Sequence, residues 1–127
     1  MRALIILILA ALLMSAPAMA DDAAVKAGMN AFSATCIYCH DNTPAKINGE
    51  GPELTDVFWR KAGSASGFTY TSAMKAAGAS GLVWDAKTLD TFLEGPSKLV
   101  PGTTMALSIA DAKQRAQIIA YLRSLHP

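Results

Sequence analysis

The feature that most constrains this chain is the segment Cys36-Ile37-Tyr38-Cys39-His40, which holds both cysteines of the sequence. Two nearby cysteines could form a disulfide or a thioredoxin-like redox pair, but neither interpretation uses the adjacent histidine. A thioredoxin-like pair also follows a strand in a βαβ unit, whereas the residues before Cys36 have a helical pattern. The C-x-x-C-H spacing instead favours one covalently bound haem c, because two thiols so spaced can each add to a vinyl group of one porphyrin. A zinc site is disfavoured, since the motif supplies three ligands and the only other histidine is His126.

A haem iron that only moves electrons needs a second axial ligand, because an open position admits small ligands and oxygen chemistry. Beyond the first twenty residues the candidates are Met29, Met74, Met105 and His126. Methionines in small domains are usually core residues, and Met29 and Met74 both lie within helical patterns. Met105 differs, because it follows a turn-forming run, Pro101-Gly102-Thr103-Thr104, that could present a thioether with a fixed approach. His126 is next to last, and we expect it to fray into solvent.

Residues 1–20 have the form of an export signal. An apolar run over residues 3–14 is short for a membrane span, and Ala18-Met19-Ala20 offers a small-x-small cleavage site. An uncleaved membrane anchor is the alternative. We expect cleavage and a periplasmic mature chain that begins at Asp21, with one domain over residues 21–127.

The charge of the chain is balanced, with 11 Lys plus Arg against 10 Asp plus Glu. Loss of Arg2 with the signal leaves equal numbers of basic and acidic residues. This balance gives no support for nucleic-acid binding, which calls for a clustered basic surface. We expect weak electrostatic steering and no nucleic-acid partner.

Apolar periodicity predicts an all-α domain that begins with a helix capped by Asp22 and ending near Thr35. Its inward face is expected to carry Val25, Met29 and Phe32. Gly28 should allow another helix to approach closely.

After the cysteines, residues 41–67 are rich in Gly, Pro, Asn and Ser and include Gly49-Glu50-Gly51-Pro52, which predicts a long loop. A loop of that length usually serves a function or a bound group. A short helix is expected over residues 71–77, ended by Gly78.

Two more helices follow. Asp85 should cap the first, with Leu89, Phe92 and Leu93 on one face, and Gly95-Pro96 should stop it. A capping-box-like pair, Ser108 and Asp111, should start the last helix. Its apolar stripe comprises Ile118, Ile119, Leu122 and Leu125.

Several stretches resemble the class I cytochrome c family of the mitochondrial and bacterial cytochrome c2 type. They are Cys36 to His40, Gly51-Pro52-Glu53-Leu54, Gly67-Phe68-Thr69-Tyr70-Thr71, Thr88-Leu89-Asp90-Thr91-Phe92-Leu93 and Val100-Pro101-Gly102-Thr103-Thr104-Met105. The resemblance covers essentially all of residues 21–127. It implies the small cytochrome c fold, with the first and last helices packed together and shorter helices and loops around one haem. It also implies that Gly28 and Phe32 pack against the last helix around Tyr121 and Leu122.

The resemblance implies the ligands of the haem. Thioether bonds form at Cys36 and Cys39, His40 is the proximal ligand of iron and Met105 the distal ligand. The Pro52 carbonyl accepts a hydrogen bond from the ring N–H of His40, a contact that fixes a ligand's orientation.

The resemblance also places Arg60, Tyr70 and Trp84 around the haem propionates, with Thr103 near the inner one. Carboxylates at the edge of an apolar crevice must be solvated or paired, and guanidinium, phenol and indole donors can do that. On composition alone, Tyr70 and Trp84 could equally be core residues and Arg60 a solvated surface charge.

This chain departs from the family pattern at several positions. Met74 stands where relatives often carry an Asn that holds a water. This implies either a drier distal side or a Met sulfur near the propionates and the ligand, with an altered potential and Met105 bond. Leu107 replaces an aromatic residue common near the exposed haem edge, and Phe92 lacks the hydroxyl of a frequent Tyr. The lysines around the edge are also few, with Lys61 and Lys98 present.

The implied function is electron transfer through the haem edge, without catalysis, by a monomer. The implied partners are transiently bound membrane redox complexes, of the cytochrome bc1 type, a terminal oxidase or a photosynthetic reaction centre, or periplasmic dehydrogenases. The alternative is a haem enzyme or ligand sensor in which Met105 is labile, although no distal acid–base His or Arg is evident beside it. A thiol–disulfide oxidoreductase is a more distant alternative.

Overall fold

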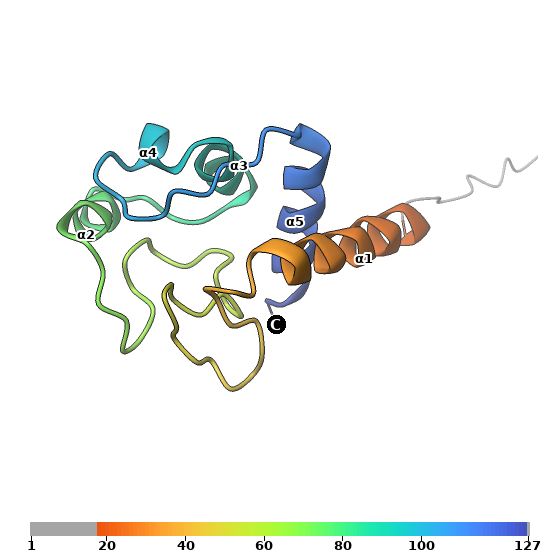
Figure 1. The fold of residues 1–127 in the computed structure, drawn as a ribbon, viewed down its shortest axis with the longest axis horizontal. Helices are drawn as coiled ribbons and strands as arrows, with labels where there is room; N and C mark the ends of the chain where they lie inside the picture. Colours follow the sequence, from red (N-terminus) through yellow and green to blue (C-terminus); the bar gives the residue numbers. More distant parts are fainter. Residues whose placement is uncertain (1–17, 127) are drawn as a thin grey trace, which may run out of the picture.

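The computed structural model describes residues 18–126, and these residues form an all-α domain. Five helices lie in this part of the chain (Figure 1): α1 (Ala18–Thr35), α2 (Ser72–Ala79), α3 (Ala86–Glu94), α4 (Pro96–Leu99) and α5 (Ala112–Ser124). The extended pairings among residues 18–126 are isolated bridges, His40 with Asn48 and Lys61 with Val83. The predicted fold class is confirmed. The predicted export signal falls largely on residues 1–17, outside the described residues.

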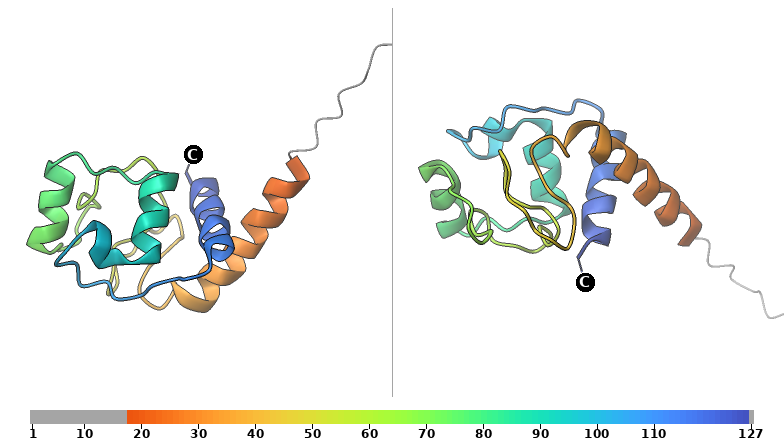
Figure 2. Two further views of the ribbon diagram at one scale, coloured as in Figure 1. Left: turned by 90° about the horizontal axis from the view of Figure 1, so that it is seen from above. Right: turned by 60° about the horizontal axis from the view of Figure 1, so that its bottom comes forward.

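Helices α1 and α5 pack on each other and cross at Gly28 (Figure 2). A Cβ atom at this glycine would lie 1.9 Å from the backbone oxygen of Gln117 and 2.8 Å from Cβ of Tyr121. The rings of Phe32 and Tyr121 meet edge to face at a centroid distance of 5.6 Å. The predicted packing of the first helix on the last is therefore present.

Two expectations for the first helix are wrong. Met29 is 43% exposed, because Gly28 and Phe32 occupy the centre of the buried stripe and Met29 lies beside it. Asp22 is not the cap, because the helix begins at Ala18. Alanine and methionine are strong helix formers, so a chain that retains residues 18–20 continues the helix through them.

Helix α2 is also longer than expected. Thr71 caps it by accepting a hydrogen bond from the Met74 N–H, but Gly78 lies inside the helix, and Ser80 is the C-cap. The glycine serves close packing here, since a Cβ atom would lie 2.0 Å from the Ala62 oxygen. Gly78 therefore allows α2 to pack closely against the loop residue Ala62.

Helices α3 and α5 have aspartate caps. Asp85 forms a reciprocal capping box with Thr88, as the predicted start of α3 requires. Asp111 caps α5 by accepting from the N–H groups of Lys113 and Gln114, whereas Ser108 is exposed and lies outside the helix. Gly95 ends α3 as predicted, but Pro96 then begins α4, which the sequence pattern did not predict. Proline suits the first turn of a helix because its missing N–H is not needed there.

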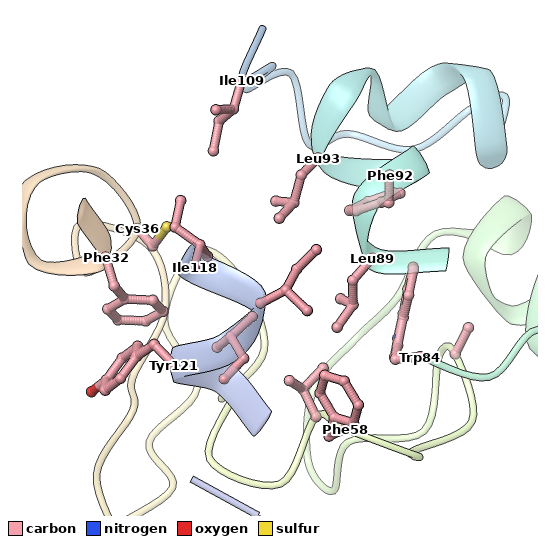
Figure 3. Packing of buried hydrophobic residues seen from close by; sticks show 14 of the residues in the cluster. Phe32, Cys36, Phe58, Trp84, Leu89, Phe92, Leu93, Ile109, Ile118 and Tyr121 are labelled. Atoms are coloured by element: carbon pink, nitrogen blue, oxygen red, sulfur yellow. The ribbon is translucent and has the colours of Figure 1, made fainter. Parts of the chain in front are cut away.

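The buried side chains form two walls (Figure 3). Phe32, Ile118 and Tyr121 come from α1 and α5, and Leu89, Phe92 and Leu93 come from α3. The long loop predicted over residues 41–67 extends to residue 71, and it contributes the buried Val57 and Phe58. Within residues 18–126 no helix combines the length and hydropathy needed to cross a bilayer.

Candidate functional site

An apolar cavity of about 650 Å³ lies between these walls and the long loop. Its lining includes every residue predicted for the site: Cys36, Cys39, His40, Pro52, Arg60, Tyr70, Trp84, Thr103 and Met105. These residues are spread over almost seventy positions of the chain, so the fold brings them together. The volume lies in the range of cofactor sites, which are typically ~300–1,000 Å³.

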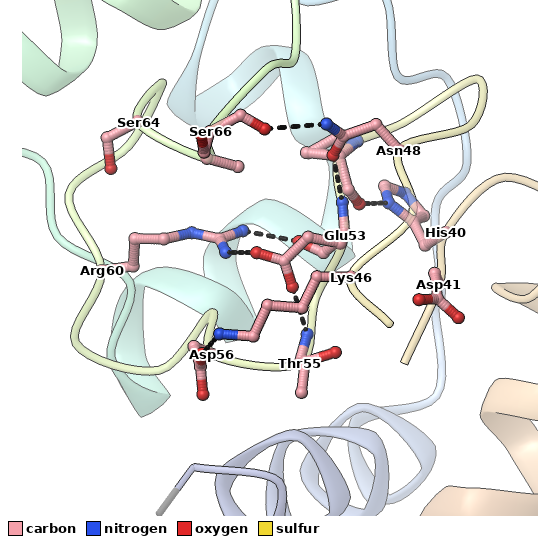
Figure 4. Close-up of polar contacts among 12 residues, drawn as sticks. His40, Asp41, Lys46, Asn48, Glu53, Thr55, Asp56, Arg60, Ser64 and Ser66 are labelled. Carbon is pink, nitrogen blue, oxygen red and sulfur yellow. Dashed lines mark hydrogen bonds and ion pairs between the residues drawn. The ribbon is translucent and has the colours of Figure 1, made fainter. Parts of the chain in front are cut away.

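His40 is held in one orientation by its neighbours (Figure 4). Its Nδ1 lies 2.7 Å from the Pro52 carbonyl oxygen and donates a hydrogen bond to it, as the resemblance to the family implied. Burial lowers the pKa of His40 below its ordinary value, the Pro52 bond opposes this shift and Arg60 adds to it. A neutral imidazole with Nδ1–H engaged leaves Nε2 with a free lone pair, which is the state that binds a metal.

The imidazole ring of His40 packs directly against Gly51. This residue is buried, and a Cβ atom here would lie 2.2 Å from Cε1 and 2.6 Å from Nδ1 of His40. This role of Gly51 was not predicted from the sequence. The sequence did contain a signal for it, because Gly51 directly precedes Pro52, whose carbonyl oxygen accepts the hydrogen bond from His40.

The cysteines are free thiols, with Cys36 buried and Cys39 exposed. Burial, with a smaller effect of Cys39, raises the pKa of Cys36 to about 11. A thiol–disulfide oxidoreductase needs a thiolate with a lowered pKa, so this environment disfavours that alternative. Two free thiols beside one imidazole and an apolar cavity fit a covalently attached haem.

Arg60 is paired inside the protein. Its guanidinium donates to the Glu53 carboxylate and, at 2.6 Å, to the Glu53 carbonyl oxygen (Figure 4). Glu53 is only 6% exposed and also accepts from the Thr55 N–H at 2.8 Å. The alternative of a solvated surface charge at Arg60 is therefore wrong. Sequence reasoning missed Glu53 as its partner, and no local spacing signals this pair across a loop.

The aromatic residues of the cavity are packed edge to face or tilted. Tyr70 meets Phe68 at 4.8 Å, and its hydroxyl accepts from the Ala65 N–H at 3.0 Å. Trp84 meets Phe92 at 4.9 Å. These contacts fix the rings as rigid walls of the cavity.

Two methionines line the cavity, and they differ in setting. Met74 is buried on α2, and Met105 is half-buried on the helix-free segment between α4 and α5. The other ligand candidates, Met29 and His126, are exposed and do not line it. The cavity therefore reduces the possible sulfur ligands to Met74 and Met105.

Comparison with known proteins gives one family. A family model described as cytochrome c matches residues 25–126. Cytochrome c2 of Rhodomicrobium vannielii is 43% identical over 118 residues, 92% of this chain and 90% of that protein. Cytochrome c of Arabidopsis thaliana is 40% identical over 98 residues, 76% of this chain and 85% of that protein.

Solved structures agree with this result. Cytochrome c2 from Rhodospirillum centenum superposes with a TM-score of 0.75 at 31% identity, covering 81% of this chain and 98% of that one. Cytochrome cH from Methylobacterium extorquens gives a TM-score of 0.71 at 40% identity, covering 79% and 97%. The fold of this chain is therefore that of solved cytochromes c2 and cH, which it covers almost completely.

Proposed function

The chain belongs to the cytochrome c family, whose members attach haem c covalently and carry electrons, and we propose that His40 and Met105 are its iron ligands. The observation that carries this proposal is the convergence of two free thiols, an oriented imidazole and Met105 on one apolar cavity. Met105 is favoured over Met74 because it lies on a segment without helical constraint, whereas Met74 is packed within α2.

Each residue of the cavity has a proposed task. Cys36 and Cys39 would hold the porphyrin by thioether bonds, and His40, oriented by Pro52, would present Nε2 to the iron. Arg60, Tyr70, Trp84 and Thr103 solvate the propionates, since buried carboxylates need donors. When bound, the haem supplies an iron that alternates between the ferrous and ferric states. A thioether ligand and an apolar lining both favour the ferrous state.

The test is the optical spectrum of the exported, haem-loaded protein. We expect a low-spin c-type spectrum with the weak far-red iron–sulfur band and no change on adding carbon monoxide to the reduced form. Met105→Ala should lose this band completely and bind carbon monoxide, because it opens one position on iron. Met74→Ala is the matched control and should keep the band.

Two other results would contradict this proposal. If the parent protein is high-spin or binds carbon monoxide, the ligand sensor or haem enzyme with a labile methionine becomes the better interpretation. If Met74→Ala loses the band and Met105→Ala keeps it, the ligand assignment is reversed.

We further propose that the protein acts without catalysis and meets its partners transiently. With His40 and Met105 both bound to it, the iron would have no free position for a substrate. Membrane complexes of the cytochrome bc1 type, terminal oxidases, reaction centres and periplasmic dehydrogenases are the candidate partners of the monomer. Balanced charge favours a weak interface with modest steering.

The proposed location is the periplasm, after cleavage of residues 1–20. We expect the mass of the purified holoprotein to correspond to a chain that begins at Asp21 plus one haem, because the small-x-small site precedes that residue. Intact mass spectrometry checks this. A mass that retains Met1 would instead indicate a carrier anchored by its leader.

A further inference from the structure

The segment that carries Met105 is fixed mainly at its two ends. At the first end, the Val100 N–H donates to the Pro96 oxygen at 2.9 Å, and the Thr103 N–H donates to the Val100 oxygen at 3.0 Å. Within the described structure, residues 106–108 donate no backbone hydrogen bond. The Met105 N–H itself makes only a long hydrogen bond, to Thr103 Oγ1 at 3.4 Å. The position of Met105 therefore depends largely on what holds the second end, at Ile109.

Arg115 of α5 holds that second end. Its Nη1 donates to the carbonyl oxygens of Ile109 and Ala110, both at 2.9 Å, and its Nε donates to the Asp90 carboxylate of α3 at 2.7 Å. The Ile109 N–H also donates to the Leu93 oxygen of α3 at 2.8 Å. One side chain thus ties the Met105 segment to both α3 and α5.

The burial of Arg115 shows that this contact is specific. The residue is 6% exposed, and a buried cation is costly unless it is paired and hydrogen-bonded. Asp90 supplies the charge, and the two carbonyl groups supply the remaining acceptors. A lysine would keep the charge but lose the planar fork that reaches three acceptors at once.

We propose that Arg115, supported by Asp90, is a positioning residue that holds the Met105 thioether on the iron. This inference rests on the proposed ligation by Met105. Arg115 does not line the cavity. It would affect the bond between Met105 and the iron only through the backbone of Ile109 and Ala110.

The experiment measures imidazole binding to the ferric holoprotein, because imidazole competes with the methionine for iron. Arg115→Met should raise imidazole affinity about tenfold or more, because it removes all three hydrogen bonds of a charged group, and such bonds are stronger than neutral ones. Arg115→Lys should fall between this variant and the parent. Asp90→Asn should give a smaller rise of about threefold, because the carbonyl contacts remain. It also keeps the inference testable if Arg115→Met does not fold.

The control for a merely structural role is Ile119→Ala. Ile119 lies buried on α5, one turn after Arg115, and does not line the cavity, so its truncation lowers stability while the hydrogen-bonding groups of Arg115 are unchanged. The imidazole affinity of this variant should stay within about twofold of the parent, because the apolar Ile119 side chain makes none of the hydrogen bonds that hold Ile109 and Ala110. The inference is overturned if Ile119→Ala raises the affinity as much as Arg115→Met, or if the Arg115 and Asp90 variants leave it unchanged. Failure of the ligand assignment itself is seen separately, as absence of the far-red band in the parent protein.

Discussion

Replacing Gly51 with alanine is expected to abolish normal ligation by His40. The new Cβ atom would lie within 2.8 Å of three imidazole atoms, Cε1, Nδ1 and Nε2, far inside van der Waals contact. The loop cannot easily retreat, because the Gly51 N–H donates to the Cys39 oxygen and the Gly51 oxygen accepts from the Gly49 N–H, both at 2.9 Å. The ring must therefore move and lose its 2.7 Å bond to Pro52.

The expected result is a holoprotein with little or no low-spin spectrum, and a yield of haem-loaded protein reduced by about tenfold. Absorption spectra and the ratio of haem to protein measure both effects. Gly49→Ala is the matched control in the same loop. Its Cβ atom would lie 3.1 Å from the Cys39 oxygen and 3.8 Å from the Cys39 carbonyl carbon, so a shift of a few tenths of an ångström relieves the one close contact. A Gly51→Ala protein with the parent spectrum would show that the imidazole does not depend on this glycine.

The candidate site could be predicted largely from the sequence because its chemistry is concentrated in short motifs. The C-x-x-C-H segment brings thiols and imidazole together by covalent spacing alone, before any tertiary fold. Met105 was distinguishable from Met29 because a turn-forming run, rather than a helical pattern, precedes it. The resemblance to a family then supplied the distant partners, such as Arg60 and Trp84, which the structure places on the same cavity.

The details that the sequence left undetermined depend on tertiary contacts. Gly28 and Met29 are adjacent in the helix, so the apolar pattern alone does not decide which of them faces inward. The approach of α5 decides it. Ser108 has a good capping spacing, but the contact between Ile109 and α3 keeps the chain extended until Asp111. The Glu53–Arg60 pair is likewise made by a loop that folds back on itself. Periodicity and capping rules describe neighbours along the chain, and these outcomes are set by neighbours in space.

The largest expected effect on stability comes from Gly28→Ala. Alanine is a better helix former than glycine by ~0.5–1 kcal/mol, so an isolated α1 would gain from the change. In the folded protein the added Cβ atom would lie 1.9 Å from the Gln117 oxygen and 2.6 Å from its carbonyl carbon. These are backbone atoms inside α5, which cannot yield as a flexible side chain can.

The two helices must therefore separate along their crossing, which loosens the edge-to-face contact of Phe32 with Tyr121. We expect a net loss of about 3 kcal/mol in the free energy of unfolding, at the upper end of overpacking effects. Denaturant unfolding of the haem-loaded protein, followed by far-ultraviolet circular dichroism, measures it. Met29→Ala is the control, since it changes the adjacent, 43% exposed residue and should cost less than ~0.5 kcal/mol. Two results would contradict this prediction: a Gly28→Ala protein as stable as the parent, or a larger loss of stability in Met29→Ala. Either would show that the close crossing of α1 and α5 at Gly28 does not stabilise the domain.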